Sequence, residues 1–192
     1  WLPGGHLQTI YPLLIRPAPP AYVRERWETP DGDFIDLDWL DPDREAPPLA
    51  HPPCRRPLLV LFHGLEGSSR SHYATALMAA AAEAGWGGVV PLNRLPRAYH
   101  SGDSAEIDWI LHRLRQRFPE RPLFAAGVSL GGNALLKWLG EQEFQATRVV
   151  EAAAAVCPPL DLTVCGDALG RGFNRVYSAH FLGTLKRGAE AR

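Results

Sequence analysis

The sequence predicts an α/β fold with a mostly parallel sheet and helices on both of its faces. Two patterns support this prediction. From residue 58 onward, short apolar runs alternate with segments of helical periodicity, which is typical of parallel strands joined by crossover helices. Before residue 58 this alternation is missing, and one segment has the two-residue period of an antiparallel strand. The 192 residues suffice for one domain with a sizeable core.

Residues 1–57 are interpreted as an N-terminal extension that carries antiparallel strands. The region 16–57 is rich in proline, with the turn-forming stretches "RPAPPAY" and "PPLAHPPCRRP". Between them "FIDLDWL" (34–40) alternates apolar and polar residues, the period of a half-buried strand, and "PDGD" before it is a turn signal. We therefore expect an antiparallel hairpin or meander at one side of the sheet.

The region 58–157 is interpreted as the core of the sheet. "LLVLFHG" (58–64) is a continuous apolar run, as in a parallel strand buried on both faces. "SHYATALMAAAAEAGW" follows as a helix, with Ser71 as the candidate N-cap and Gly85 as the candidate C-cap. "GGVVPL" (87–92) is predicted to be a second buried strand.

The same alternation continues in the second half of this region. "SAEIDWILHRLRQRF" (104–118) has apolar residues at helical spacing, and "PLFAAGVS" (122–129) is a third apolar run. "GGNALLKWLGEQ" (131–142) reads as the next helix, and "VVEAAAAVCPP" (149–159) contains a fourth strand. Four parallel strands with intervening helices are therefore expected.

Composition and charge exclude several classes of protein. The formal net charge of −1 argues against a nucleic-acid partner bound through its phosphates. No apolar run reaches the roughly 18 residues that a membrane span needs. Cys54, Cys157 and Cys165 show no metal-ligand spacing, and we expect buried thiols in a reducing compartment. The expectation is a cytoplasmic protein without a metal site or transmembrane segment, for which peripheral membrane contact stays open.

One serine lies where a strand is predicted to pass directly into a helix. The stretch G-V-S-L-G (127–131) matches G-x-S-x-G in the strand-then-helix context that this motif requires. There the serine is forced into a strained backbone conformation, while Gly127 and Gly131 allow strand and helix to approach closely. The alternative is a turn of small residues with an incidental serine. The context favours Ser129 as a nucleophile.

A second segment fits the same chemistry. An acyl-transfer enzyme needs backbone N–H donors aimed at the oxyanion of its tetrahedral intermediate. The first donor normally follows the nucleophile, here Leu130, and the second comes from a loop after an earlier strand, where Leu65 is best placed beside Gly64. His63 is a less favoured candidate for the base, and we expect it to be a hydrogen-bonded loop histidine.

Five motifs together resemble a known family. They are "WLPGGHLQTIYP", "FHGLEGSSRSHYA", "NRLPRAYHSGD", "GVSLGGNALLKWLGE" and "ALGRGFNRVY". In this order they are similar to the α/β-hydrolase family of YheT-type bacterial hydrolases and the related eukaryotic abhydrolase-domain lipases, from Trp1 to about Arg187. The resemblance implies a serine hydrolase that acts on carboxylic esters, which can be lipid-like, without metal or cofactor. It implies Ser129 as nucleophile and the 63–65 turn at the oxyanion hole.

The resemblance also suggests a division of the chain and two departures from the family. We expect one domain over 1–192, with the extension at 1–57, the sheet core at 58–157 and the start of a helical cap at 158–192. The family has a segment of the type F-R-G-C-S-G before the "NRLPR" motif, but here "GGVVPL" runs straight into it. We therefore expect residues to be missing between Val90 and Asn93, most plainly at Pro91–Leu92. The family also continues past "GFNRVY", so a missing C-terminal part is expected as well. Because the chain starts at Trp1 without methionine, we expect it to begin inside a longer one.

The acid and base of a catalytic triad are harder to place. In this fold they follow the nucleophile in the order acid, then histidine. After Ser129 the candidates are Asp161, Asp167 and His180. Asp161 lies one strand too early, in a "PPLDL" context typical of a turn or helix start, and His180 lies in a predicted helix. We expect neither to be catalytic, and an open crevice without a histidine beside Ser129.

Three functions remain compatible with the sequence. The leading interpretation is an esterase or lipase-like hydrolase with an acyl-enzyme on Ser129. An acyltransferase or thioesterase on the same scaffold is the first alternative, because the fold does not fix the acyl acceptor or the leaving group. The second is a non-catalytic relative that binds a ligand or partner. The intact serine turn argues against it, and the missing acid and base argue for it.

Overall fold

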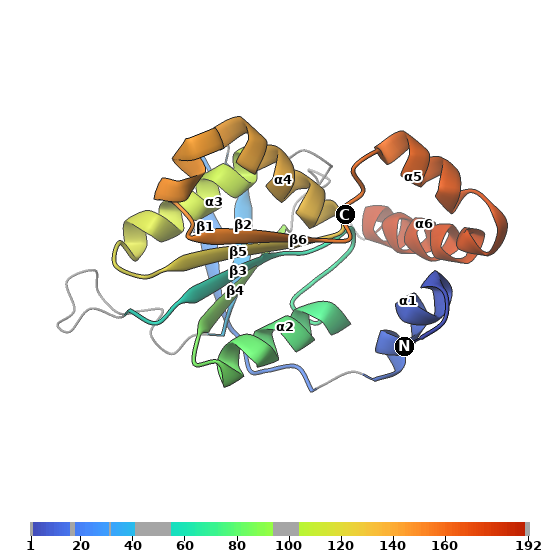
Figure 1. Ribbon diagram of the computed structural model, residues 1–192, viewed down its shortest axis with the longest axis horizontal. Helices are drawn as coiled ribbons and strands as arrows, with labels where there is room; N and C mark the ends of the chain where they lie inside the picture. The colour runs from blue at the N-terminus through green and yellow to red at the C-terminus, as the bar shows by residue number, and fades with distance from the viewer. Residues whose placement is uncertain (1, 16–17, 31, 41–54, 94–103, 191–192) are drawn as a thin grey trace.

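The computed structural model describes residues 2–15, 18–30, 32–40, 55–93 and 104–190, and Figure 1 shows the arrangement of their helices and strands. The strands are β1 (Val23–Glu28), β2 (Phe34–Leu40), β3 (Leu58–Phe62), β4 (Gly87–Asn93), β5 (Leu123–Val128) and β6 (Ala152–Val156). The α-helices are α1 (Gly5–Leu14), α2 (His72–Glu83), α3 (Ser104–Arg117), α4 (Leu130–Gln142), α5 (Leu162–Leu169) and α6 (Arg175–Glu190). Two 3₁₀ turns, η1 (Glu143–Arg148) and η2 (Gly172–Asn174), complete the described elements.

The strands form one sheet in the order β1-β2-β4-β3-β5-β6. β4, β3, β5 and β6 run parallel, whereas β2 lies antiparallel to β4 and β1 antiparallel to β2. This confirms the predicted parallel core with an antiparallel segment at one side. The carboxyl ends of β3 and β5, neighbours in the sheet, therefore lie side by side.

Helices cover both faces of the sheet, as the sequence predicts. α3 and α4 pack on one face and α2 on the other (Figure 1). The apolar positions of α3 at helical spacing are fully buried: Ile107, Ile110, Leu111 and Leu114. α2 begins after its predicted N-cap Ser71. Its C-cap is Ala84 and not the predicted Gly85, which follows directly with a φ of 74°, the left-handed conformation that ends many helices.

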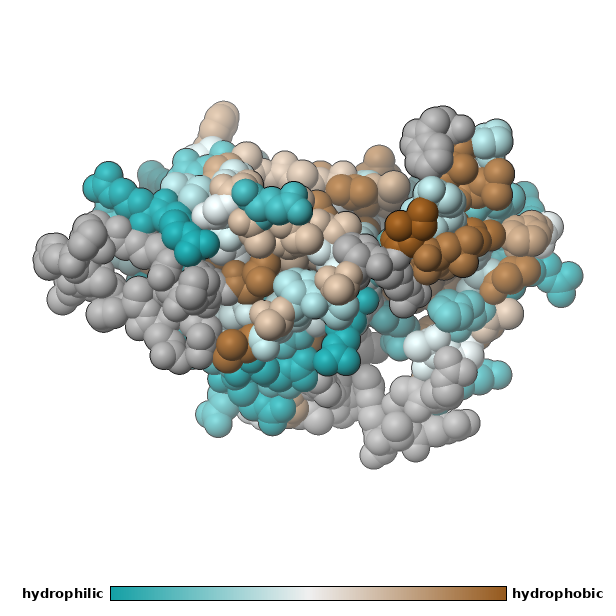
Figure 2. Space-filling view, turned by 90° about the horizontal axis from the view of Figure 1, so that it is seen from below, coloured by the Kyte–Doolittle hydropathy of each residue, from teal (hydrophilic) through white to brown (hydrophobic). Residues whose placement is uncertain are grey.

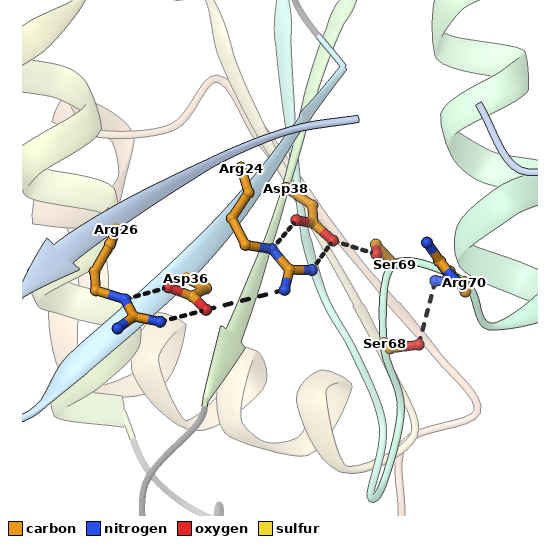
Figure 3. A network of polar contacts seen from close by, with 7 residues as sticks. All are labelled: Arg24, Arg26, Asp36, Asp38, Ser68, Ser69 and Arg70. Carbon is orange, nitrogen blue, oxygen red and sulfur yellow. Dashed lines mark hydrogen bonds and ion pairs between the residues drawn. The ribbon is translucent and has the colours of Figure 1, made fainter. Parts of the chain in front are cut away.

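Strand β2 differs from its prediction as a half-buried strand. Its carboxylates Asp36 and Asp38 are only 2% and 3% exposed, so the strand is buried on both faces. Arg24 and Arg26 of β1 lie opposite in register, and each binds the facing carboxylate through two hydrogen bonds of 2.7 to 3.1 Å (Figure 3). Arg24 also forms a longer ion pair of 4.0 Å with Asp36. Paired and hydrogen-bonded in this way, an ionised carboxylate can be buried. The sequence-based prediction was wrong because it treated every polar residue as solvent-facing.

The prediction of a gap in the chain between Val90 and Asn93 is also wrong. β4 runs without interruption through this stretch, and Pro91 and Leu92 pair in register with residues 37 and 36 of β2. β4 pairs with β3 only as far as Val89, so from there on it has one partner strand. A proline, which lacks a backbone N–H donor, is tolerated where one side of a strand is unpaired.

Strand β6 and the cysteines that follow it are largely exposed. Its five residues are exposed or half-buried within the described structure, because β6 pairs with β5 on one side only. Cys157 directly after it is exposed and Cys165 is half-buried, so the expectation of buried thiols is wrong for both. Cys54 lies outside the described residues.

Helices α1, α5 and α6 form one end of the molecule beside the sheet (Figure 1). His6 of α1 hydrogen-bonds to the Tyr177 hydroxyl of α6 at 3.1 Å and packs against Phe173. Figure 2 shows hydrophobic side chains gathered at this end. The exposed ones are Leu7, Leu13, Leu14, Ile15, Leu160, Leu162, Val164, Phe173, Val176, Leu182 and Leu185. Of the helices described, none combines the length and the apolar character needed to cross a bilayer.

Helix α4 approaches the end of β3 so closely that only glycine fits at position 131 in its first turn. A Cβ atom at Gly131 would lie 2.5 Å from the carbonyl oxygen of His63 and nearer still to that of Phe62. Both neighbours are backbone atoms of the sheet, which cannot move aside as a flexible side chain can. Gly140, near the other end of α4, has no atom within 4 Å of the corresponding position.

These two glycines give a matched test of the packing. We expect Gly131→Ala to lower the free energy of unfolding by roughly 1–3 kcal/mol, because α4 must shift away from β3. Gly140→Ala should raise it by up to about 1 kcal/mol, because alanine favours an exposed helix interior. Urea unfolding of the full-length protein measures both. Equal stability of the two variants would contradict the close approach.

Candidate functional site

Ser129 lies at the turn from β5 into α4 in a strained backbone conformation. Its φ of 54° and ψ of −118° are unusual for a residue with a side chain. The backbone around it is anchored on both sides, since Ser129 N–H donates to the Val156 carbonyl at 2.9 Å and the Ser129 carbonyl accepts from Asn133 N–H at 3.0 Å. The predicted strained turn is thus present, and its serine is exposed.

Glycines at the turn allow three backbone segments to meet. A Cβ at Gly127 would lie 2.5 Å from the Gly131 carbonyl oxygen, and one at Gly64 would lie 3.1 Å from the Ser129 Cβ. Gly64 belongs to the loop after β3, so this loop lies directly against the serine. Leu130 is the first residue of α4, and the N–H groups of a first helical turn have no acceptor inside the helix.

The loop after β3 has a fixed backbone next to Ser129. Gly64 N–H donates to the Tyr73 hydroxyl at 2.9 Å. The Gly64 carbonyl accepts from Gly67 N–H at 2.9 Å and lies 2.8 Å from the His63 Nδ1. With Gly64 N–H occupied, Leu65 N–H remains the nearby candidate for an oxyanion donor, and its role and that of Leu130 stay predictions.

His63 is held within this loop rather than presented as a base. Burial lowers the pKa of its imidazole, against smaller opposing effects of the Gly64 carbonyl and Glu66. The ring is therefore neutral at pH 7, and its Nδ1 is directed at the Gly64 carbonyl. This contact agrees with the interpretation of His63 as a hydrogen-bonded loop histidine.

The later acid and base candidates have other contacts. Asp161 is the N-cap of α5, where its Oδ1 accepts from Val164 N–H at 2.9 Å. Asp167 forms a 4.0 Å ion pair with Arg171 one helical turn away. His180 lies on an exposed position of α6 with its ring beside Phe181. These contacts are those of helix ends and helix surfaces.

Sequence reasoning missed Tyr73, which contacts the loop beside Ser129, and the buried Asp38, which reaches the same loop through Ser69. Tyr73 is part of the "FHGLEGSSRSHYA" motif, so the motif itself could have pointed to it. Most of the "NRLPRAYHSGD" motif, from residue 94 to 103, lies outside the described residues. Within the described ranges, no three histidine, cysteine, aspartate or glutamate residues are grouped as a metal site would need.

Comparison with known proteins gives relatives over nearly the whole chain. The putative esterase YheT of Escherichia coli is 40% identical over 195 residues, covering 96% of this chain and 54% of that protein. The human phospholipase ABHD3 is 30% identical over 193 residues, covering 96% of this chain and 46% of that protein. The chain thus spans about half the length of these curated relatives. No family model matches it.

Solved structures agree with this relationship at the level of the fold. An α/β serine hydrolase without a lid from Xanthomonas campestris aligns with a TM-score of 0.54 and 17% identity, over 76% of this chain and 65% of that one. At this identity the likeness shows the fold alone. Together with the relatives above, it supports an α/β-hydrolase relationship of the YheT type for this chain.

Proposed function

We propose that the chain carries the nucleophile and the oxyanion-binding loop of a serine hydrolase that cleaves carboxylic esters. The observation that carries this proposal is the left-handed backbone of Ser129 at the N-terminus of α4, directly against the loop at Gly64. Such a strained and anchored serine, exposed at the carboxyl end of a parallel sheet, is typical of a nucleophile elbow. The names of the relatives as esterase and phospholipase support the same class of substrate.

The proposed reaction has two halves. Ser129 Oγ attacks the ester carbonyl carbon and loses its proton to a general base, while the carbonyl oxygen becomes an oxyanion. The N–H groups of Leu65 and Leu130 stabilise this oxyanion, together with the positive end of the α4 dipole. The alcohol leaves with a proton, and water then attacks the acyl-enzyme to release the acid and restore the serine.

The base and its orienting acid are proposed to be residues other than Asp161, Asp167 and His180. Both partners follow the serine in this fold, and these three have the contacts of caps and surfaces. A serine hydroxyl needs an adjacent base to be a strong nucleophile at neutral pH. Turnover is therefore expected only where such a base and acid are present beside Ser129.

The substrate is proposed to have an apolar acyl group. α5 follows β6 by only a few residues, and β6 ends at Val156, whose carbonyl holds the Ser129 N–H. The exposed apolar side chains of α1, α5 and α6 gather at the end of the molecule where these three helices lie (Figures 1 and 2). An apolar surface beside a nucleophile favours lipid-like esters over small polar ones.

The role of the serine is tested by Ser129→Ala in the full-length protein. We expect kcat/KM on p-nitrophenyl esters to fall at least about 10³-fold, because the covalent route is lost. A fluorophosphonate probe should label the parent and the control Ser178→Ala, but not Ser129→Ala. Full turnover by Ser129→Ala would exclude the proposed nucleophile, and labelled but inactive parent protein would favour a binding module.

The exclusion of the later candidates is tested separately. Asp161→Asn keeps a good N-cap, and His180→Gln changes an exposed side chain, so kcat should stay within about threefold of the parent. The pH–rate profile should keep its shape, since neither side chain is proposed to transfer a proton in the reaction. A loss of kcat above about 100-fold in either variant would place that residue in the triad.

A further inference from the structure

The loop between β3 and α2, residues 63–71, has a backbone that its own sequence does not explain. Glu66 has a φ of 56°, a left-handed conformation that costs energy for a residue with a side chain. Gly67 follows, where a Cβ would collide with the Tyr73 hydroxyl and come within 2.8 Å of the Gly64 carbonyl. A strained backbone persists only where surrounding contacts hold it, so the contacts of this loop are informative.

The first contact is at the start of the loop. Tyr73, in the first turn of α2, accepts the Gly64 N–H at 2.9 Å. Burial raises the pKa of the Tyr73 phenol, so the hydroxyl keeps its proton, and Ser71 is its second hydrogen-bond partner. Ser71 Oγ in turn accepts the Ser68 N–H at 3.0 Å. Tyr73 and Ser71, at the start of α2, thus connect Gly64 near the beginning of the loop with Ser68 near its end.

The second contact is at the end of the loop, on the opposite side from α2. Ser69 is buried, and its hydroxyl donates to Asp38 Oδ2 of β2 (Figure 3). Arg24 binds the same carboxylate through hydrogen bonds of 2.7 and 2.8 Å. The Tyr22 hydroxyl donates to the Ser69 carbonyl at 3.2 Å, and burial raises the pKa of Tyr22 to about 12, with Asp38 adding to the effect.

Both contacts restrict the orientation of one peptide group, the one between Gly64 and Leu65. The Gly64 carbonyl is held by Gly67 N–H and by His63 Nδ1. The Leu65 N–H belongs to the same planar trans peptide as that carbonyl and points in the opposite direction. The contacts of Tyr73 and Ser69 that fix the loop therefore also fix the direction of the Leu65 N–H. Oxyanion donors must be held within about 0.5 Å of the productive position.

We propose that Tyr73 and Ser69 are positioning residues, which hold the loop against Ser129 so that the Leu65 N–H faces the oxyanion. Tyr73 acts from α2 through Gly64, and Ser69 acts from the opposite side through Asp38. Neither hydroxyl is required to touch the substrate. This inference rests on the proposed function, because the two residues are inferred to orient a donor that stabilises the transition state of that reaction.

The test uses Tyr73→Phe and Ser69→Ala in the full-length protein. Each deletes one hydroxyl and leaves the rest of its side chain in place. We expect kcat per fluorophosphonate-titrated site to fall about tenfold to 100-fold, with KM within about twofold. A misdirected donor stabilises the transition state less and leaves the binding of the substrate unchanged. Unchanged kcat per titrated site in both variants would overturn the proposal.

Asp36→Asn is the matched control for a purely structural effect. Asp36 is buried on the same strand as Asp38 and binds Arg26 through two hydrogen bonds, as Asp38 binds Arg24. Its ion pair with Arg24 is long, at 4.0 Å, and its carboxylate is not the one that Ser69 contacts. This variant should lower the melting temperature and leave kcat per titrated site unchanged. An equal fall in kcat in Asp36→Asn would show that general destabilisation explains the effect, and would overturn the proposal.

Amide hydrogen exchange separates this inference from the proposed function. In Tyr73→Phe the hydrogen-bonded amides of Gly64, Gly67 and Ser68 should exchange at least about tenfold faster than in the parent, while Asp36→Asn leaves them protected. Unchanged exchange would overturn the positioning role even if no ester were turned over. Faster exchange in Tyr73→Phe, together with a parent protein that shows no Ser129-dependent turnover, would instead overturn the proposed function.

Discussion

The arrangement around Ser129 depends on one steric constraint, the contact of the first turn of α4 with the carboxyl end of β3. The carbonyl oxygens of Phe62 and His63 lie where a side chain at Gly131 would stand. Because no Cβ is there, the helix can begin directly above two neighbouring parallel strands. The serine between β5 and α4 is then placed beside the loop that leaves β3, and the oxyanion donors proposed for it come from these same two segments. Catalytic geometry of this kind follows from backbone packing before any side chain is considered.

Much of this could be predicted from the sequence, because it depends on local patterns. Apolar runs, helical periodicity and the N-cap of α2 are properties of neighbouring residues, and they predicted the alternating strands and helices correctly. The turn at Ser129 was predicted for the same reason, since G-x-S-x-G between a strand and a helix has few other structural uses. Each of these patterns is contained within a short segment of the sequence.

What could not be predicted depends on contacts between distant segments. The burial of Asp36 and Asp38 requires the register that places Arg24 and Arg26 opposite them, which no pattern within β2 reveals. Pro91 fits within β4 because the pairing with β3 has already ended at that point. In both cases the sequence suggested a wrong structure because the partner strand decides what a residue can do.

The polar groups that hold the loop beside Ser129 share an electrostatic property. Burial raises the pKa values of Tyr22 and Tyr73 and lowers that of His63, so each shift moves a group's titration further from neutral pH. Above the lowered pKa of His63 and below the raised pKa values of the tyrosines, all three groups are neutral. Their hydrogen bonds then do not change with pH, and the loop keeps one geometry throughout that range. A titration seen in turnover near neutral pH would therefore report the base that accepts the Ser129 proton, and not the loop that orients the oxyanion donor.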